Sequence, residues 1–224
     1  MPKINADESR ELARNSSDCS FLLTHLIRQN HCKTEIDERR NLESILNIAR
    51  SASGPLLRAS TVGWYGTSSG SHVFNPSTGN LDGHVNNKAV CFTESTLAGL
   101  RAHRDLFKVK YGLAFDRDDL FAKGANPCIN VSECLLKRSQ SWHRSEHPEH
   151  LFNFVPEQLQ PFVNVIHSSF DATHEREWRY PGDMQFKWAD LKFVFCPEDM
   201  FHNFVAVQVN AMPCLFDLAW LDRI

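Results

Sequence analysis

Short blocks of alternating apolar and polar residues predict several strands and a few short helices along this chain. Strands are expected at residues 20–26, 56–59, 88–93, 108–115, 127–131, 191–195 and 212–218. Helices are expected at residues 7–14, 35–52, 95–104, 116–124 and 156–165, and another from 197 onward. Because strands and helices are interspersed without a regular strand–helix–strand rhythm, the fold class is α+β.

The helix at residues 35–52 has clear start and stop signals. Thr34-Glu35-Ile36-Asp37 fits a capping box, in which the first side chain and the fourth satisfy each other's backbone N–H groups. Gly54-Pro55 ends the pattern, since neither residue continues a helix readily.

Residues 61–87 are rich in glycine, serine and asparagine, and several aromatic and histidine residues are embedded among them. A loop of this length in a compact domain is usually functional or disordered. Because disordered segments are poor in aromatic residues, the composition favours a functional loop.

Residues 173–180 combine acids, bases and aromatics and end at Pro181-Gly182-Asp183. As a strand, the segment would place Glu175, Glu177 and Arg179 on one face. Charges on both faces make a poor core strand, because burying an unpaired charge costs several kcal/mol. The segment is therefore either an exposed edge or the floor of a polar site, and the rest of the chain favours the polar site.

Length and composition are those of an ordinary globular protein, with 224 residues, of which 42% are apolar and 23% charged. We expect a single domain over residues 1–224, with residues 1–18 as a helical extension. The net charge of −3 gives no overall signature of nucleic-acid binding, although a local basic groove stays open. No apolar stretch approaches the roughly 20 residues that span a bilayer.

The seven cysteines are scattered and form no C-x-x-C motif, and most of them lie beside apolar residues. This distribution is typical of buried thiols in a reducing compartment, so we expect a cytoplasmic protein without disulfides. The first residues contain no apolar run and are not expected to act as a signal peptide.

Polar residues stand at or near the ends of three apolar strands: His25, the pair Thr93-Glu94, and Glu177. Each has an ordinary structural explanation. A histidine after a strand is often structural, Thr93-Glu94-Ser95 can cap the following helix, and Glu177 can pair with Arg179 or Arg176 at a sheet edge. Their combination favours a site, since sites are built where strand ends converge.

These segments resemble a known family in their order along the chain. Leu23-Thr24-His25, Cys91 to Ser95, Tyr111 to Phe115 and His174 to Arg179 resemble the AbiGi group of abortive phage infection proteins. That group is similar to ADP-ribosyltransferases, including DarT-type toxins that modify DNA. The resemblance covers roughly residues 21–197 and implies a split β-sandwich core with surrounding helices.

The resemblance implies roles for particular residues. Glu177 would be catalytic, stabilising the oxocarbenium-like ribose formed when the nicotinamide–ribose bond of NAD breaks. Glu175 would interact with the acceptor, as the first glutamate of a Glu-x-Glu motif does, while the second glutamate is catalytic. The residues that would bind NAD are Thr24, His25, Arg58, Tyr65, Phe92, Thr93 and Tyr111. His25 would hold the adenosine-side ribose, and Thr93 would position the nicotinamide half. Arg58 or Arg50 would face the diphosphate, and Tyr65, Trp64 or Tyr111 would stack on the nicotinamide.

One position departs from the family pattern. Glu94 stands where classical members have a hydroxyl residue, so either it caps a helix or the site is altered. A degenerate pocket that binds no NAD stays open. The implied function is an NAD-dependent phage-defence effector or toxin that modifies a nucleic acid or a protein. The alternatives are an inactive antitoxin or sensor module and an NAD glycohydrolase.

Other chemistries have weaker support. His143, His147 and His150 lack the spacing of a rigid helical ligand set, so no metal site is expected. The chain has no Gly-x-Ser-x-Gly elbow, and residues 66–71 lack the Gly-Lys-Ser/Thr of a phosphate loop.

Overall fold

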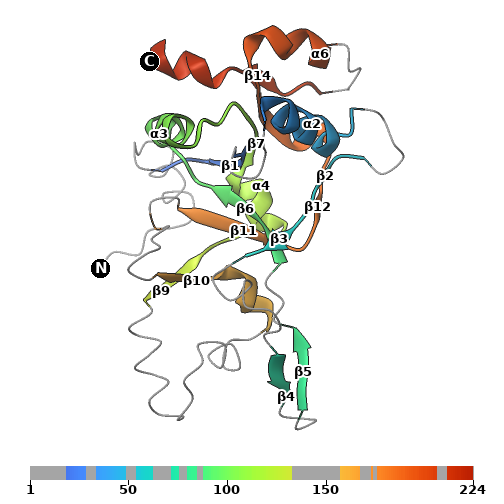
Figure 1. The fold of residues 1–224 in the computed structure, drawn as a ribbon, viewed down its shortest axis with the longest axis vertical. Coiled ribbons are helices and arrows are strands. Elements are labelled where there is room, and N and C mark those ends of the chain that lie inside the picture. Colours follow the sequence, from blue (N-terminus) through green and yellow to red (C-terminus); the bar gives the residue numbers. More distant parts are fainter. Residues whose placement is uncertain are drawn as a thin grey trace. The chain divides into compact units, whose positions relative to one another are not determined.

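The computed structural model describes residues 19–28, 34–48, 54–62, 72–75, 80–84, 88–132, 157–166, 173, 176–205 and 211–223. The chain divides into two compact units (Figure 1). Unit 1 comprises Met1–Leu57, Phe92–Lys123 and Gln185–Ile224, and unit 2 comprises Arg58–Cys91 and Gly124–Met184. Both units are therefore assembled from segments that are distant in the sequence.

Unit 1 contains a mostly antiparallel sheet in the order β14-β13-β7-β1, followed by the end of β6. These strands are β14 (Cys214–Phe216), β13 (Leu191–Phe195), β7 (Tyr111–Asp116), β1 (Leu22–Ile27) and β6 (Lys88–Thr93). Only β13 and β14 run parallel among these described pairs, and Thr24 of β1 lies opposite both Thr93 and Ala114. The arrangement confirms the α+β class.

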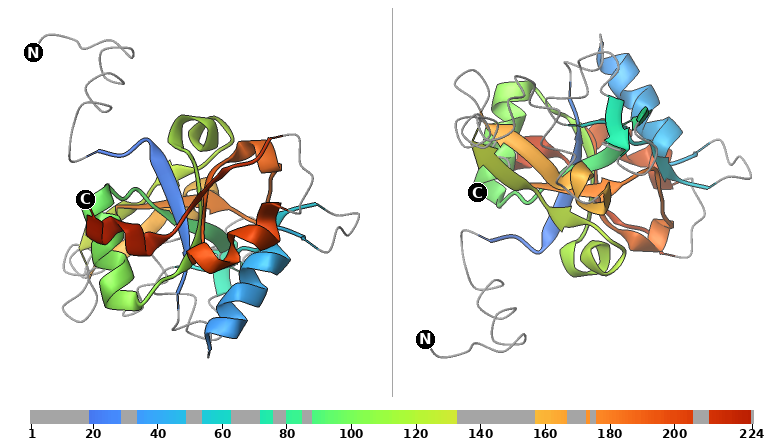
Figure 2. Two further views of the ribbon diagram at one scale, coloured as in Figure 1. Left: turned by 90° about the horizontal axis from the view of Figure 1, so that it is seen from above. Right: turned by 90° about the horizontal axis from the view of Figure 1, so that it is seen from below.

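The helices of unit 1 are α2 (Glu35–Ile45), α3 (Leu97–Phe107), α4 (Arg117–Ala122) and α6 (Phe201–Val205). Single 3₁₀ turns or short 3₁₀ helices occur at η6 (Trp188–Asp190), η7 (Glu198–Met200) and η8 (Leu218–Arg223). Helix α3 and η8 lie side by side in both figures (Figures 1 and 2). A core cluster joins α3, β7, β13 and η8 through Leu100, Val109, Ala114, Phe195, Leu218 and Leu221.

Strands β1 and β7 approach each other closely at Gly112. A β-carbon added there would lie 2.7 Å from the backbone oxygen of His25. Glycine at this position therefore lets β7 pair with the strand that carries Thr24 and His25.

Local side chains define the helix starts of unit 1. Thr34 and Asp37 form the predicted capping box of α2. Thr96 caps α3 by accepting from the N–H of Gly99, and Asp116 caps α4. The N-cap of α3 is thus Thr96, and the suggested capping role of Glu94 is wrong.

Unit 2 contains the first part of β6, and β3 (Ser60–Thr61) pairs antiparallel with it. Strand β11 (Glu177–Pro181) pairs antiparallel with β8 (Asn126–Pro127). Strands β9 (Ile129–Ser132) and β10 (Val163–Ile166) form a parallel pair, and β10 directly follows the 3₁₀ helix η4 (Glu157–Phe162). Strands β4 (His72–Asn75) and β5 (Asn80–His84) form a hairpin. Two short strands complete the described elements: β2 (Leu56–Leu57), which belongs to unit 1, and β12 (Met184–Gln185), which has one residue in each unit.

Several predicted elements are confirmed, and others need correction. The strands at 88–93 and 191–195 are confirmed at both ends. The helix predicted at 156–165 is wrong in type, because residues 157–162 form a 3₁₀ helix containing Pro161 and the chain then enters β10. The long loop predicted at 61–87 contains the β4–β5 hairpin. The helix predicted at 7–14 lies outside the described residues.

The strand predicted at 173–180 begins only at Glu177. Arg176 has a φ of 44°, in the left-handed region that residues with a β-carbon rarely adopt, so the extended backbone starts after it. Glu175 lies outside the described residues.

Candidate functional site

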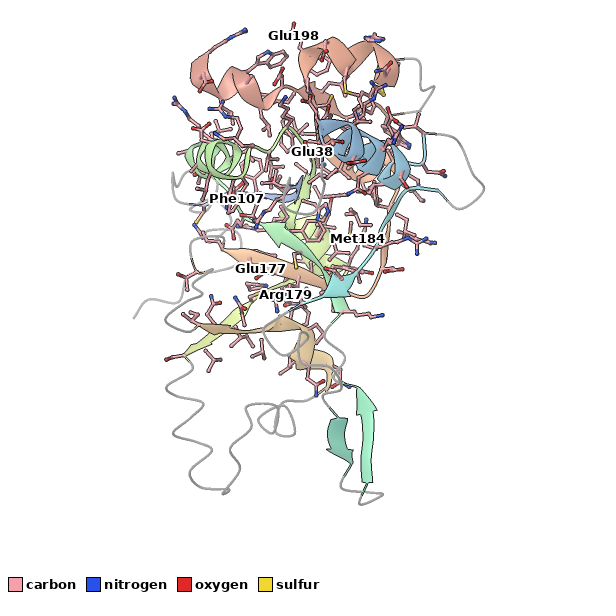
Figure 3. All side chains as sticks on the ribbon, viewed as in Figure 1. Glu38, Phe107, Glu177, Arg179, Met184 and Glu198 are labelled. Carbon is pink, nitrogen blue, oxygen red and sulfur yellow. The ribbon has the colours of Figure 1, made fainter. Side chains whose placement is uncertain are left out.

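An ion pair at the start of β11 is the most constrained polar feature of unit 2. Arg179 donates from Nε to Glu177 Oε1 at 2.9 Å and from Nη2 to Oε2 at 3.1 Å (Figure 3). The two residues are two positions apart on a strand, so their side chains share one face. The Glu177 and Arg179 side chains are 11% and 3% exposed. This two-point geometry fixes the plane of the carboxylate.

Arg179 also holds the backbone of the neighbouring segment. Its Nη1 donates to the carbonyl oxygens of Pro161 at 2.9 Å and Val163 at 3.0 Å. Burial acts to lower the pKa of Arg179, but the Glu177 carboxylate outweighs it, and the pKa is raised above the usual value. The guanidinium is therefore a permanent cation that ties β11 to η4 and β10.

Two cysteines lie close to the same ion pair. Burial, followed by the charge of Glu177, raises the pKa of the Cys91 thiol, which also hydrogen-bonds to the Glu177 side chain. The backbone N–H of Cys128 donates to the carbonyl oxygen of Glu177 at 2.8 Å. Cys91 stays a protonated thiol beside the carboxylate, so it acts as a donor and not as a thiolate nucleophile.

The predicted NAD-binding residues of β1 and β6 belong to unit 1. Thr24, Phe92 and Thr93 are only 2–4% exposed, whereas His25 is half-buried. The His25 ring meets the Phe92 ring edge-on, with ring centroids 5.9 Å apart. The sheet therefore brings these four predicted residues together as two cross-strand pairs on opposite faces, Thr24 with Thr93 and His25 with Phe92, and His25 is the most accessible of the four.

A chain of hydroxyl contacts follows Thr93. Thr93 Oγ1 and Ser95 Oγ are 2.8 Å apart, and Ser95 Oγ lies 3.4 Å from His103 Nδ1 on α3. Neither Ser95 nor His103 was expected at the site from the sequence. His103 falls eight residues after Ser95, and only the direction of α3 brings the two together.

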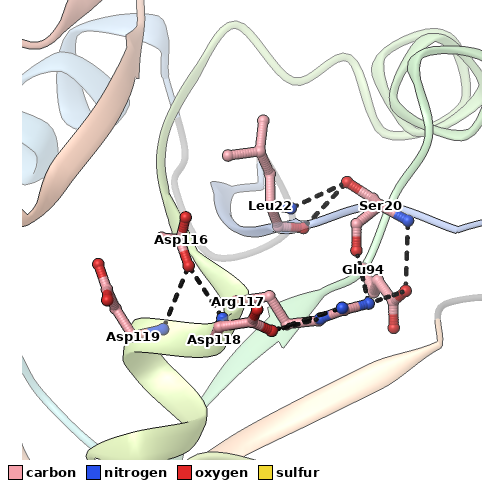
Figure 4. A network of polar contacts seen from close by, with 7 residues as sticks. All are labelled: Ser20, Leu22, Glu94, Asp116, Arg117, Asp118 and Asp119. Atoms are coloured by element: carbon pink, nitrogen blue, oxygen red, sulfur yellow. Dashed lines mark hydrogen bonds and ion pairs between the residues drawn. The ribbon is translucent and has the colours of Figure 1, made fainter. Parts of the chain in front are cut away.

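Glu94 belongs to a separate polar network (Figure 4). Its Oε1 accepts from Arg117 Nη1 at 3.4 Å and from the backbone N–H of Ser20 at 3.3 Å. Arg117 also donates to the backbone oxygen of Ser20 at 3.1 Å. Glu94 is 7% exposed and is thus held in a structural ion pair that fixes the entry to β1.

The remaining predicted residues have diverse surroundings. Tyr111 is 2% exposed and its hydroxyl donates to Met200 Sδ at 3.3 Å, so its ring is packed inside unit 1. Arg58 is exposed and belongs to unit 2. Tyr65 and Glu175 lie outside the described residues.

Within each unit the structure gathers part of the predicted site. Unit 1 brings together Thr24, His25, Phe92 and Thr93, and unit 2 places Glu177 against Arg179 and Cys91. The sequence placed Arg179 on the same strand face as Glu177 but did not predict that Arg179 would orient the Glu177 carboxylate.

In the described part of the chain, no three histidine, cysteine, aspartate or glutamate side chains gather as a metal-ion site, and residues 143–150, which hold the weak histidine candidate, lie outside it. In the same part, every helix is too short or too polar to cross a membrane.

Comparison with models of protein families, with curated proteins and with solved structures finds no match to this chain.

Proposed function

We propose that this chain is an NAD-dependent ADP-ribosyltransferase-like effector of phage defence, with a split β-sandwich core, that modifies a nucleic acid or a protein. The observation that carries the proposal is the Glu177 carboxylate, held in one plane by two N–H groups of Arg179. The order of motifs along the chain supplies the reaction class.

A fixed carboxylate suits this chemistry. Cleavage of the bond between nicotinamide and ribose builds positive charge on the ribose, and a pre-oriented negative group stabilises that charge without having to reorganise. Each carboxylate oxygen has two lone-pair positions, so an oxygen that accepts one N–H from Arg179 can still accept a ribose hydroxyl. Arg179 acts here as a positioning residue.

The residues present fit NAD in part. Half-buried His25 can donate to a ribose hydroxyl, and exposed Arg58 can pair with the diphosphate. Thr24, Phe92 and Tyr111 are buried and would support the binding surface from behind. The Tyr111 ring is covered and is therefore not available to stack on the nicotinamide.

A second candidate is a binding module that works as an antitoxin or sensor without catalysis. Both Glu177 oxygens accept from Arg179, and Arg179 also binds two backbone carbonyls, which is how a structural ion pair is built. In this alternative the pair stabilises unit 2 and has no substrate.

An assay with NAD labelled in its adenosine half distinguishes the transferase from the binding module. The purified chain is incubated with labelled NAD and with nucleic acid or a cell extract as the acceptor. We expect Glu177→Gln to lower label transfer about a hundredfold or more, since it removes the charge and keeps the side-chain size. Free labelled ADP-ribose in place of a labelled macromolecule would assign the chain as an NAD glycohydrolase.

Arg179→Lys is the matched control, because it disturbs the same ion pair and leaves the carboxylate in place. We expect it to lower transfer less than Glu177→Gln does, at a temperature where both variants are folded, because the carboxylate and a positive charge remain while the two-point contact that fixes the carboxylate plane is lost. Equal losses in both variants would mean that the pair is structural. Phage protection that survives Glu177→Gln would rule out the enzyme and support the binding module.

A further inference from the structure

Cys91 and Glu177 lie on neighbouring strands of unit 2. Strand β6, which carries Cys91, is hydrogen-bonded to β11, which begins at Glu177. The N–H of Gly182, just after β11, donates to the carbonyl oxygen of Lys88, at the start of β6, at 2.9 Å. Three residues further along β6, the Cys91 side chain hydrogen-bonds to the Glu177 side chain, near the other end of β11. Both contacts fit only if the two strands run antiparallel.

The Cys91 thiol is the hydrogen-bond donor to the Glu177 carboxylate. Burial, followed by the charge of Glu177, raises the pKa of the thiol, so the sulfur keeps its proton. A carboxylate has acceptor positions only, which leaves the S–H as the group that donates in this contact. The contact therefore places a neutral donor from β6 against the negative end of Glu177.

Glu177 stands at a strand end, where regular pairing orients a residue less firmly than in mid-strand. It is the first residue of β11, and Arg176 before it has the left-handed φ of 44°. The N–H of Cys128 holds the Glu177 backbone, and Arg179 holds the carboxylate from within β11. Cys91 contacts the carboxylate from the neighbouring strand and so fixes the Glu177–Arg179 pair relative to β6.

We propose that Cys91 is a positioning residue that donates a hydrogen bond from β6 and holds the Glu177 carboxylate in the orientation that meets the ribose of NAD. The inference rests on the proposed function for the reaction, whereas the contact itself stands on the strand pairing within unit 2. The Glu177 side chain is 11% exposed, so a substrate meets only a small part of it. A rotation of the carboxylate would therefore move the group out of reach of the reacting atoms.

Infrared spectroscopy of the S–H stretch tests the contact without a substrate. The difference between the spectra of the native chain and Cys91→Ala isolates the Cys91 band. We expect a broad band at low frequency, because a hydrogen bond to a charged acceptor weakens the S–H bond. In Glu177→Gln the acceptor becomes a neutral amide, and the Cys91 band should move to higher frequency.

Cys214 provides the reference band. It is exposed, and its S–H faces the uncharged carbonyl oxygen of Leu215 at 3.7 Å. Its band is isolated in the same way with Cys214→Ala and should not move in Glu177→Gln. A Cys91 band at the Cys214 frequency, or one that ignores Glu177→Gln, would overturn the proposal.

The positioning role is tested with labelled NAD at a temperature where the native chain, Cys91→Ala and Cys91→Ser are all folded. We expect Cys91→Ala to lower kcat about three- to tenfold, which is the range of one ordinary hydrogen bond, and to leave KM within about twofold. Cys91→Ser should recover most of the loss, because its hydroxyl also donates. Equal losses in both variants, or a change in KM alone, would contradict the role.

Failure of the proposed function gives a different pattern. If the native chain neither cleaves NAD nor transfers label, the proposed reaction fails and the positioning role falls with it, while the infrared bands still decide whether the thiol donates to Glu177. If the native chain consumes NAD and Cys91→Ala does so with the native kcat, the proposed function stands and only the role of Cys91 is wrong.

Discussion

Tyr111 illustrates how burial of a single residue changes its titration. Its ring is 2% exposed and its hydroxyl donates to Met200 Sδ. Burial first, and then the nearby charges of Glu35 and Glu38, raise the pKa of Tyr111 from an ordinary 10.0 to about 12. Because the folded chain holds this proton more tightly than the unfolded chain, the resulting stability is present below pH 10 and is lost as the pH rises toward 12.

We therefore predict that Tyr111→Phe flattens the alkaline limb of the stability profile. The measurement is the free energy of unfolding in urea at a series of pH values from neutral to strongly alkaline. The difference between the native chain and Tyr111→Phe should shift by about 2–3 kcal/mol against the native chain as the tyrosine ionises. Other groups titrate equally in both proteins, so parallel curves would show that Tyr111 has no raised pKa.

Individual residues also show what a sequence can and cannot reveal. The sequence left Arg179 and Arg176 open as partners of Glu177, and the structure shows Arg179, which shares a strand face with Glu177 because the side-chain period of a strand is two. The other partners of Arg179 are the backbone oxygens of Pro161 and Val163, which carry no side-chain signature. In the same way, the partner of Glu94 is Arg117, a residue that a later strand and helix bring close to Glu94.

At the scale of elements, two glycines offer an opposed pair of substitutions. Gly112→Ala on β7 would place a methyl group 2.7 Å from the His25 backbone oxygen, whereas at Gly99 on α3 the nearest atom is 3.6 Å away. We predict that Gly112→Ala destabilises unit 1 by about 1–3 kcal/mol, because two paired strands must separate. Gly99→Ala should instead stabilise by up to about 1 kcal/mol, since alanine favours a helix.

Urea unfolding of both variants at neutral pH tests this contrast. If both substitutions have the same sign, then the close approach of β1 and β7 does not require glycine. The prediction also bears on the site, because the same approach aligns His25 with Leu113 of β7.

Elements with a strong local pattern were predictable, and those decided by distant contacts were not. Residues 191–195 are apolar at nearly every position and form β13 as predicted. Residues 156–165 have a helical pattern, but Pro161 lacks the N–H that an α-helix needs, and the pairing of β10 with β9 draws the following residues into a strand. The start of β11 depends on the left-handed backbone of Arg176, which no side-chain pattern reports.

At the scale of the whole molecule, the chain passes between its two units four times, after Leu57, Cys91, Lys123 and Met184. The glycine-, serine- and asparagine-rich residues 61–87 lie within the first segment of unit 2, but their composition was interpreted as a loop and not as a boundary between units. The divided arrangement has a consequence for the predicted site. His25 and Thr93 depend on the packing of unit 1, and Glu177 depends on the packing of unit 2.

Hydrogen exchange can test whether the units open independently. Proteins open in cooperative groups of residues that often follow compact structural units. We predict that Gly112→Ala lowers amide protection in β1, β7 and β13 of unit 1, and that Arg179→Lys lowers it in β10 and β11 of unit 2. Each variant should leave the other unit's strands within about threefold of their native exchange rates, since a factor of three is under 1 kcal/mol.

The two variants serve as controls for each other, because each acts on a contact wholly inside one unit. A uniform loss of protection in both units would mean that the chain opens as a single cooperative body. In that case Glu177→Gln could impair the His25 side of the site through stability alone. Independent opening would instead confine the effect of each substitution to its own unit, so that a loss of NAD binding in Glu177→Gln could be attributed to the Glu177 carboxylate.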